Sequence, residues 1–236
     1  MDRSRRRRVT IVAIATIVAA VCIAFGFWQL QRLTDRRALN AEIRAARSAS
    51  PTRVRTADDI RALSAFRAVV VEGTYDIEDE VLLYGRSLDG EPGHFVVTPL
   101  ALDDDSGVLV LRGWVPFSLD SAPVVEAAPT ARNVVVEGWL IAPESRGRSH
   151  PDRDGIVRTL DITGIGDRLP FDLAPFAIQL RAQDPPNAEL PVPVPLPELS
   201  EGPHLSYAIQ WFCFAAVAVA GAAILMRRER APTAAP

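Results

Sequence analysis

The sequence predicts a membrane protein in which two transmembrane α-helices, one at each end, flank an extracytoplasmic, mostly-β (α+β) domain. Residues 9–27 contain no charged side chain, and neither do residues 207–226. At about 1.5 Å per residue, each run covers about 30 Å, the thickness of the hydrocarbon core of a bilayer. A period of two in hydrophobicity across residues 65–182 predicts the sheet, which we expect to be a small antiparallel, partly closed barrel.

The first apolar run is interpreted as a retained anchor. It follows the basic cluster Arg5–Arg8, as a signal peptide would. However, it is longer than the apolar region of a signal peptide, and no small-x-small cleavage site follows it. The chain continues instead into Gly26-Phe27-Trp28-Gln29-Leu30-Gln31-Arg32.

Charge determines the expected orientation. The net charge is +4 before the first run, +2 after the second and −9 between them. Basic flanks stay in the cytoplasm, so we expect both termini inside and the acidic middle outside a multi-pass protein of the plasma membrane. Trp28 and Trp211 then lie near the outer ends of their helices, where aromatic belts form. The expected divisions are a cytoplasmic segment 1–8, spans 9–28 and 207–226, an extracytoplasmic domain 29–206 and a cytoplasmic tail 227–236.

The composition also excludes several function classes. An acidic exported domain does not suit nucleic-acid binding, which needs a basic face. Cys22 and Cys213 both lie in the predicted spans, so the exported domain has neither a disulfide nor a thiolate metal site. No hydrolase, zinc-protease or nucleotide-binding motif occurs. We therefore expect a protein that is not an enzyme.

Within the exported segment, residues 30–47 keep helical character and continue the first span. Thr56 followed by Asp59 predicts a capping box at the start of a short helix. Gly73 and Gly138 lie inside predicted strands, where glycine marks a bend that helps a small sheet to curl. Residues 183–203 are rich in proline and are expected to be an extended connector. The predicted strands are 66–75, 80–86, 94–102, 108–115, 133–141 and 176–180.

The most informative single residue is His204. On a helix it shares a face with Tyr207 and Trp211, at the outer boundary of the second span. An imidazole there suits an axial ligand for haem iron, with Gln210 donating to a haem substituent. From the residues alone, a histidine that caps the helix in the headgroup region is the favoured interpretation, and the haem ligand is the alternative.

Five motifs in order resemble the Surfeit-locus family of cytochrome c oxidase assembly factors. The first follows the family pattern G-x-W-Q-x-x-R, the third G-x-x-x-x-T-P-L, the fourth V-x-R-G-W-V-P and the last H-L-x-Y-A-x-Q-W-F. The resemblance covers almost the whole chain. The five segments are Gly26–Arg32, Val71–Tyr75, Gly93–Leu100, Leu109–Pro116 and His204–Phe212.

The resemblance implies a role in the biogenesis of respiratory chain complex IV. Such proteins help to insert haem a into the catalytic subunit of haem–copper oxidases, and the histidine of the last motif, here His204, is the implied ligand of the haem iron. Implied partners are that subunit, other oxidase assembly factors and the lipid bilayer. The alternative is a scaffold without a cofactor that docks oxidase subunits or other assembly factors.

The expected working surface lies at the outer ends of the two spans. His204, Tyr207, Gln210 and Trp211 would lie beside Trp28, Gln29 and Arg32. Arg112 has two open roles: it pairs with a haem propionate, or it forms a salt bridge within the exported domain.

Overall fold

The computed structural model describes residues 3–144 and 149–228. The start of the predicted cytoplasmic segment (1–2) and the tail from 229 to 236 lie outside these ranges. The chain forms two compact units. The helical unit comprises the chain up to Glu42 and from Glu198 onwards, and the β domain comprises Ile43–Pro197.

A single long helix, α1 (Arg3–Ser48), begins the structure. Its 46 residues correspond to about 70 Å, more than twice the thickness of a bilayer core. The helix therefore continues well past residue 28, as the absence of glycine and proline from residues 30–47 predicted.

The second long helix, α4 (His204–Arg228), begins three residues earlier than the predicted span. His204 is thus its first residue. Arg227 and Arg228 occupy its last turn, where positive charge complements the helix dipole. Both α1 and α4 are long and apolar enough to cross a membrane.

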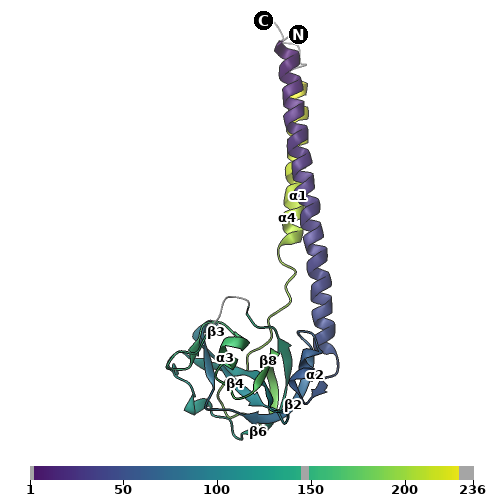
Figure 1. Ribbon diagram of the computed structural model, residues 1–236. Coiled ribbons are helices and arrows are strands. Elements are labelled where there is room, and N and C mark those ends of the chain that lie inside the picture. Colours follow the sequence, from purple (N-terminus) through teal and green to yellow (C-terminus); the bar gives the residue numbers. More distant parts are fainter. Residues whose placement is uncertain (1–2, 145–148, 229–236) are drawn as a thin grey trace. The chain divides into compact units, whose positions relative to one another are not determined.

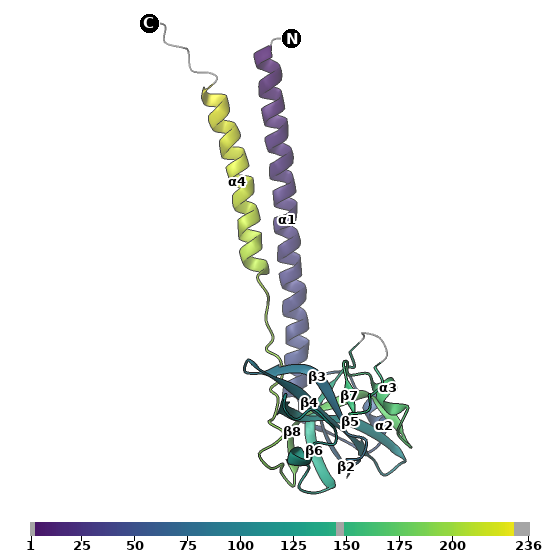
Figure 2. The same cartoon turned by 90° about the vertical axis from the view of Figure 1, so that its left-hand side faces the viewer.

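The helices α1 and α4 run antiparallel, so that the start of α1 and the end of α4 point the same way, and the helices diverge toward these ends (Figure 1 and Figure 2). Small side chains let them approach: Ala19, Cys22 and Ala215 form a buried cluster between them. A Cβ atom on Gly26 would lie 2.6 Å from the ring of Phe212, so a larger residue there would require this ring to move. Small residues at such crossings are typical of helices that pack in a bilayer.

The β domain contains one curled, eight-stranded sheet (Figure 2). Its strand order is β1-β2-β6-β8-β5-β4-β3-β7. Short helices α2 (Ala57–Arg61) and α3 (Ile162–Gly166) and the 3-10 helix η1 (Val125–Ala127) complete the domain. The strands are β1 (Thr52–Val54), β2 (Ala68–Tyr75), β3 (Val81–Leu88), β4 (Glu91–Ala101), β5 (Ser106–Pro116), β6 (Asn133–Ile141), β7 (Ile156–Val157) and β8 (Asp172–Asp184).

The sheet is mixed, which corrects the prediction of an antiparallel one. β1 pairs with β2, β3 with β7 and β5 with β8 in parallel. The other described pairings are antiparallel. The predicted meander holds only for β3, β4 and β5, because the long connections that precede β7 and β8 bring these strands in alongside β3 and β5.

The curl comes from a second contact of β2, which pairs with β4 through Thr74↔Ala101 and Tyr75↔Leu100. Gly73 permits this contact, because a Cβ atom there would lie 2.5 Å from the carbonyl oxygen of Ala101. Gly138 permits the close approach of β6 to β8, because a Cβ atom there would lie 2.3 Å from the carbonyl oxygen of Gln179. The strand register also shifts beside Gly138. The bulge predicted at Gly138 is confirmed, whereas the register of β2 with β6 is continuous through Gly73.

The predicted capping box is confirmed as well. The backbone N–H of Asp59 donates to Thr56 Oγ1 at 3.1 Å, and the backbone N–H of Thr56 donates to Asp59 Oδ2 at 3.2 Å. Hydrogen bonds from the backbone N–H groups of Arg55 and Thr56 lower the pKa of Asp59. Helix α2 then buries Ala57 and Ile60 in the same core as β2, β6 and β8.

The first part of the proline-rich segment, predicted to be an extended connector, packs on the sheet. Trp114 and Val192 exchange backbone hydrogen bonds of 2.7 and 2.8 Å, and Gln179 Nε2 donates to the carbonyl of Val194. A Cβ atom on Gly113 would lie 2.5 Å from the Val192 carbonyl oxygen. The segment up to Val194 is therefore docked on the sheet, and the helical unit begins only at Glu198.

Candidate functional site

The centre of the candidate site is a contact between the two long helices. His204 Nδ1 lies 2.9 Å from Gln29 Oε1. Because an amide oxygen only accepts, the Nδ1–H donates to it, and the lone pair of the imidazole is then on Nε2. A metal-ligating histidine is held in the same way, with one ring nitrogen donating to a protein carbonyl or carboxylate. The structure thus confirms that His204 and Gln29 lie together.

Beside this contact lies the polar hollow, a depression of about 460 Å³. Trp28 and Arg32, both predicted site residues, line it together with His204. The guanidinium of Arg32 lies over the ring of Trp28, 5.7 Å from its centroid. The residues that line the polar hollow combine charged groups with an aromatic and an aliphatic side chain: Trp28, Arg32, Asp35, Arg36, Leu39 and His204.

Three lining residues, Asp35, Arg36 and Leu39, were missing from the predicted site. A signal for them existed in the sequence, since they follow Trp28 by 7, 8 and 11 residues and so fall on its face of a continuous helix. Applying the helical period outward from Trp28 would have found them.

The segment before His204 is tied to the same part of α1. Asn40, only 2% exposed, donates from Nδ2 to the carbonyl of Ser200 at 3.1 Å. Arg37 pairs with Glu201 at 2.9 Å. These bonds fix the chain immediately before α4, and they therefore help to hold His204 against Gln29.

Next to the polar hollow, toward the start of α1, aromatic residues connect the two helices. Trp211 stacks on Phe25 with ring centroids 4.8 Å apart, and Phe27 meets Phe212 edge-on. Trp211 is on the His204 face of α4, as predicted, but it packs against α1. Tyr207 is 48% exposed and Gln210 is exposed, and neither is among the residues that line the polar hollow.

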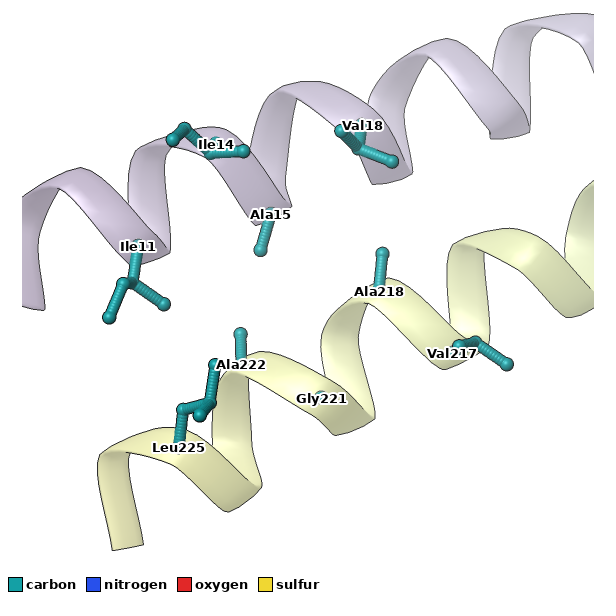
Figure 3. A pocket seen from close by; sticks show the side chains of 9 residues that line it. All are labelled: Ile11, Ile14, Ala15, Val18, Val217, Ala218, Gly221, Ala222 and Leu225. Atoms are coloured by element: carbon teal, nitrogen blue, oxygen red, sulfur yellow. The ribbon is translucent and has the colours of Figure 1, made fainter. Parts of the chain in front are cut away.

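Two further depressions are almost entirely apolar. The apolar groove, of about 410 Å³, is lined on α1 by Val21, Ala24, Phe25 and Trp28. A second hollow of about 380 Å³ lies between the helices further from His204, and in Figure 3 Ala15 of α1 faces Ala218 and Ala222 of α4 across it. Trp28 borders both the apolar groove and the polar hollow.

Arg112 belongs to the β domain. Two roles were left open for it, pairing with a haem propionate or a salt bridge within the domain, and the structure shows the salt bridge. The residue is 0% exposed, and its Nη1 lies 3.1 Å from Glu80 Oε2. Its Nη2 donates to the carbonyl of Ala127 and to Asn187 Oδ1. Because these partners already use its charge inside the domain core, Arg112 is removed from the proposed cofactor-binding residues.

No role was predicted for His94 of β4 from the sequence. Its side chain is 0% exposed, stacks on Phe117 at 4.9 Å and lies near Tyr84. Both ring nitrogens are without a hydrogen-bond partner in the described part of the chain. Burial lowers the pKa of His94. Across residues 3–144 and 149–228, no three His, Cys, Asp or Glu side chains are grouped to hold a metal ion.

Comparison with known proteins decides the family. A profile described as the SURF1 family matches residues 16–216, which span most of α1, the whole β domain and the first half of α4. The chain belongs to the SURF1 family. The resemblance drawn from the five sequence motifs is therefore confirmed.

Relatives in the SURF1 family come from distant organisms. A SURF1-like protein of Rickettsia felis (strain ATCC VR-1525 / URRWXCal2) is 27% identical over 207 residues, covering 84% of this chain and 89% of that protein. An uncharacterised SURF1-like protein of Mycobacterium tuberculosis (strain ATCC 25618 / H37Rv) is 28% identical over 221 residues, covering 86% and 80%. One from Monosiga brevicollis is 27% identical and covers 89% and 85%. The match to the family profile includes parts of both helices and the whole β domain.

Proposed function

We propose that this protein is a non-enzymatic assembly factor for haem–copper cytochrome c oxidase that holds haem a for delivery to the catalytic subunit. The observation that carries the proposal is the 2.9 Å contact between His204 Nδ1 and Gln29 Oε1. It leaves the lone pair of Nε2 available to a metal ion, and His204 is one of the residues that line the polar hollow. Membership of the SURF1 family supports the role in oxidase assembly.

The residues around His204 fit a haem. Nε2 suits an axial ligand of the iron, and Trp28 offers a flat apolar surface beside it. Arg32 and Arg36 provide cations for the two propionates, with Asp35 as the single acid among the lining residues. The first turn of α4 adds the positive end of a helix dipole. Bound haem would supply only a coloured, redox-active iron centre, and the chain's own task is to hold and orient it.

The same proposal includes a location. Both helices cross the plasma membrane, with the termini in the cytoplasm and the β domain outside, because the basic flanks face inward. The polar hollow then lies at the outer boundary of the bilayer, where Trp28 and Arg32 suit the headgroup region. A periplasm-active reporter fused near residue 120 should be active, whereas the same reporter fused after residue 228 should be inactive.

The visible spectrum of the purified protein tests the proposal. The protein purified from cells that make haem a should carry haem a, and His204→Ala should lose it while its far-UV circular dichroism is unchanged. His150→Ala, at an exposed histidine of the β domain, is the matched control and should keep the haem. Unchanged haem content and affinity in His204→Ala would contradict the assignment of the ligand.

A second candidate function is the scaffold without a cofactor. It is favoured by an exposed group of large apolar side chains on the β domain, where Tyr84 is 40% exposed and lies beside Phe117. Such groups mark surfaces that contact other proteins. On this alternative the purified protein is colourless, while deletion of the gene still lowers oxidase activity. The spectrum therefore separates the two functions.

A further inference from the structure

One buried polar residue of α1 lies outside the polar hollow. Asn40 is only 2% exposed, although residues 34–39 and 41–42 around it are exposed. It continues a line of buried or half-buried positions, here called the seam: Cys22, Gly26, Gln29, Leu33 and Asn40. Steps of three, four or seven residues are the spacing of helices that pack along their length, and a single asparagine at such a position specifies their register at a cost in stability.

The apolar contacts along the seam give α4 little information about its position along α1. Beside Cys22, α4 contributes Ala215, and residues 215–223 are six alanines, two valines and one glycine. Contacts between such small side chains change little after a shift by one helical turn, about 5 Å. Phe212 beside Gly26 adds a steric preference. A hydrogen bond, in contrast, joins two specific atoms, so it distinguishes one register from the next.

Two of the hydrogen bonds between α1 and the chain around the start of α4 lie three turns apart. Asn40 holds Ser200, and Gln29 holds His204. From residue 29 to residue 40 the helix rises about 16 Å. The four residues from Ser200 to His204 span at most about 14 Å, and side chains cover the remainder. The connection therefore has little slack, and its anchor at Asn40 stops α4 from sliding toward the start of α1.

The neighbouring ion pair is a weaker anchor. Arg37 and Glu201 lie 2.9 Å apart, but their side chains are 55% and 44% exposed. Ion pairs that water reaches contribute little to stability. The amide of Asn40 is shielded from water, so its hydrogen bond is the fixed point of the connection.

We propose that Asn40 is a positioning residue: its bond to Ser200 sets the register of α4 against α1 and thereby brings His204 to Gln29. A slip by one turn would place His204 beside Phe25 or Leu33, neither of which can accept a hydrogen bond from its Nδ1–H. The register itself needs no ligand, whereas its consequence for haem rests on the proposed function.

Two variants release the register in different ways. Asn40→Leu removes the donor and keeps the seam apolar. Insertion of Gly-Ser between Glu201 and Gly202 keeps the bond of Asn40 but lengthens the connection to about 20 Å. Gln31→Leu is the matched control, because it makes a similar change at an exposed amide of α1 outside the seam and the polar hollow.

The register is measured without haem. Spin labels on Cys213, which is exposed on α4, and on Thr34→Cys, at an exposed position of α1, report the distance between the helices in full-length protein in nanodiscs, with Cys22→Ala as background. The wild type and Gln31→Leu should each give one narrow distance distribution. Asn40→Leu and the insertion should each broaden it by up to about 5 Å, one helical turn.

Haem affinity is then measured by titration of the Soret band. Asn40→Leu and the insertion should each weaken haem binding about tenfold, the lower end of the cost of losing the partner of a ligating histidine, because His204 meets Gln29 in only a fraction of the molecules. The free energy of unfolding of Asn40→Leu should equal or exceed that of the wild type, since a buried asparagine lowers stability. A purely structural role of Asn40 predicts the opposite change.

The possible outcomes separate the inference from the proposed function. A distance distribution of Asn40→Leu as narrow as that of the wild type overturns the inference and leaves the proposed function intact. Broadening together with a lower free energy of unfolding also overturns it, because packing in general is then lost. If both variants broaden the distribution and even the wild type binds no haem, the role of Asn40 stands and the proposed function is overturned.

Discussion

The two units of the molecule use the same residue types in opposite ways. In the β domain, Arg112 is buried and its charge is paired with Glu80. In the helical unit, Arg32 lies over Trp28 at the border of a hollow. The histidines differ in the same sense, since His94 is enclosed by aromatic rings whereas His204 is oriented by Gln29 beside the hollow. The comparison teaches that the β domain uses its polar groups for its own internal contacts, while the helical unit keeps polar groups at the lining of an open hollow.

The largest expected effect is on stability at Arg112. Arg112→Met leaves Glu80 as an unpaired buried charge and should lower the free energy of unfolding by about 3–5 kcal/mol. Arg32→Met, the same change in the helical unit, should leave stability unchanged within about 0.5 kcal/mol. Urea unfolding followed by tryptophan fluorescence measures both. The double variant Glu80→Leu/Arg112→Met should recover much of the loss. A free energy of unfolding of Arg112→Met equal to that of the wild type would contradict the stabilising role of the buried ion pair.

The next effect is on haem affinity at Gln29. Gln29→Leu removes the acceptor of the Nδ1–H of His204 and should weaken haem binding by about 10- to 100-fold, the usual cost of losing such a partner. Gln29→Glu keeps an acceptor oxygen and should retain most of the affinity. Titration of the Soret band measures both variants, and their unfolding curves should match the wild type. Equal affinities for Leu and Glu at this position would show that Gln29 does not orient His204.

The smallest effect concerns pH and His94. Because burial holds the pKa of His94 below its ordinary value near 6.5, the unfolded chain binds more protons than the folded one as pH falls through this range. The stability of the wild type should therefore decrease between about pH 7 and pH 5. His94→Phe removes both unpartnered nitrogens, so it should flatten this slope and gain about 1 kcal/mol at pH 5. Urea unfolding at the two pH values checks this, and an unchanged slope would contradict it.

Much of this molecule could be predicted from local patterns. The uncharged runs predicted the long apolar helices α1 and α4, the period of two predicted six strands, and the Thr56–Asp59 spacing predicted a capping box. The elements that the sequence did not predict depend on contacts between residues far apart in the chain. β1 and β7 have three and two residues and exist only through their parallel partners. The five-residue helix α3 contains two glycines, which oppose helix formation.

The candidate site shows the same division. His204, Gln29, Trp28 and Arg32 were predicted, because each lies in a motif at the end of an apolar run. The hydrogen bond between Gln29 and His204 joins residues 175 apart in sequence, so it could be seen only in the structure. The role of Arg112 depended likewise on Glu80, which lies 32 residues away on the loop before β3.

The place where the chain enters and leaves the β domain has a consequence for how such proteins can be built. Arg47 Nη1 donates to the carbonyl of Pro197 at 3.1 Å, so the first and last segments of the domain meet at one point. A domain whose two ends meet behaves as a cassette inserted into a hairpin. The cassette from Ile43 to Pro197 can therefore be exchanged for that of a relative, or for a short turn, without lengthening either helix. Chimaeras made at this junction would test whether haem content follows the hairpin and whether oxidase activity in the cell follows the cassette.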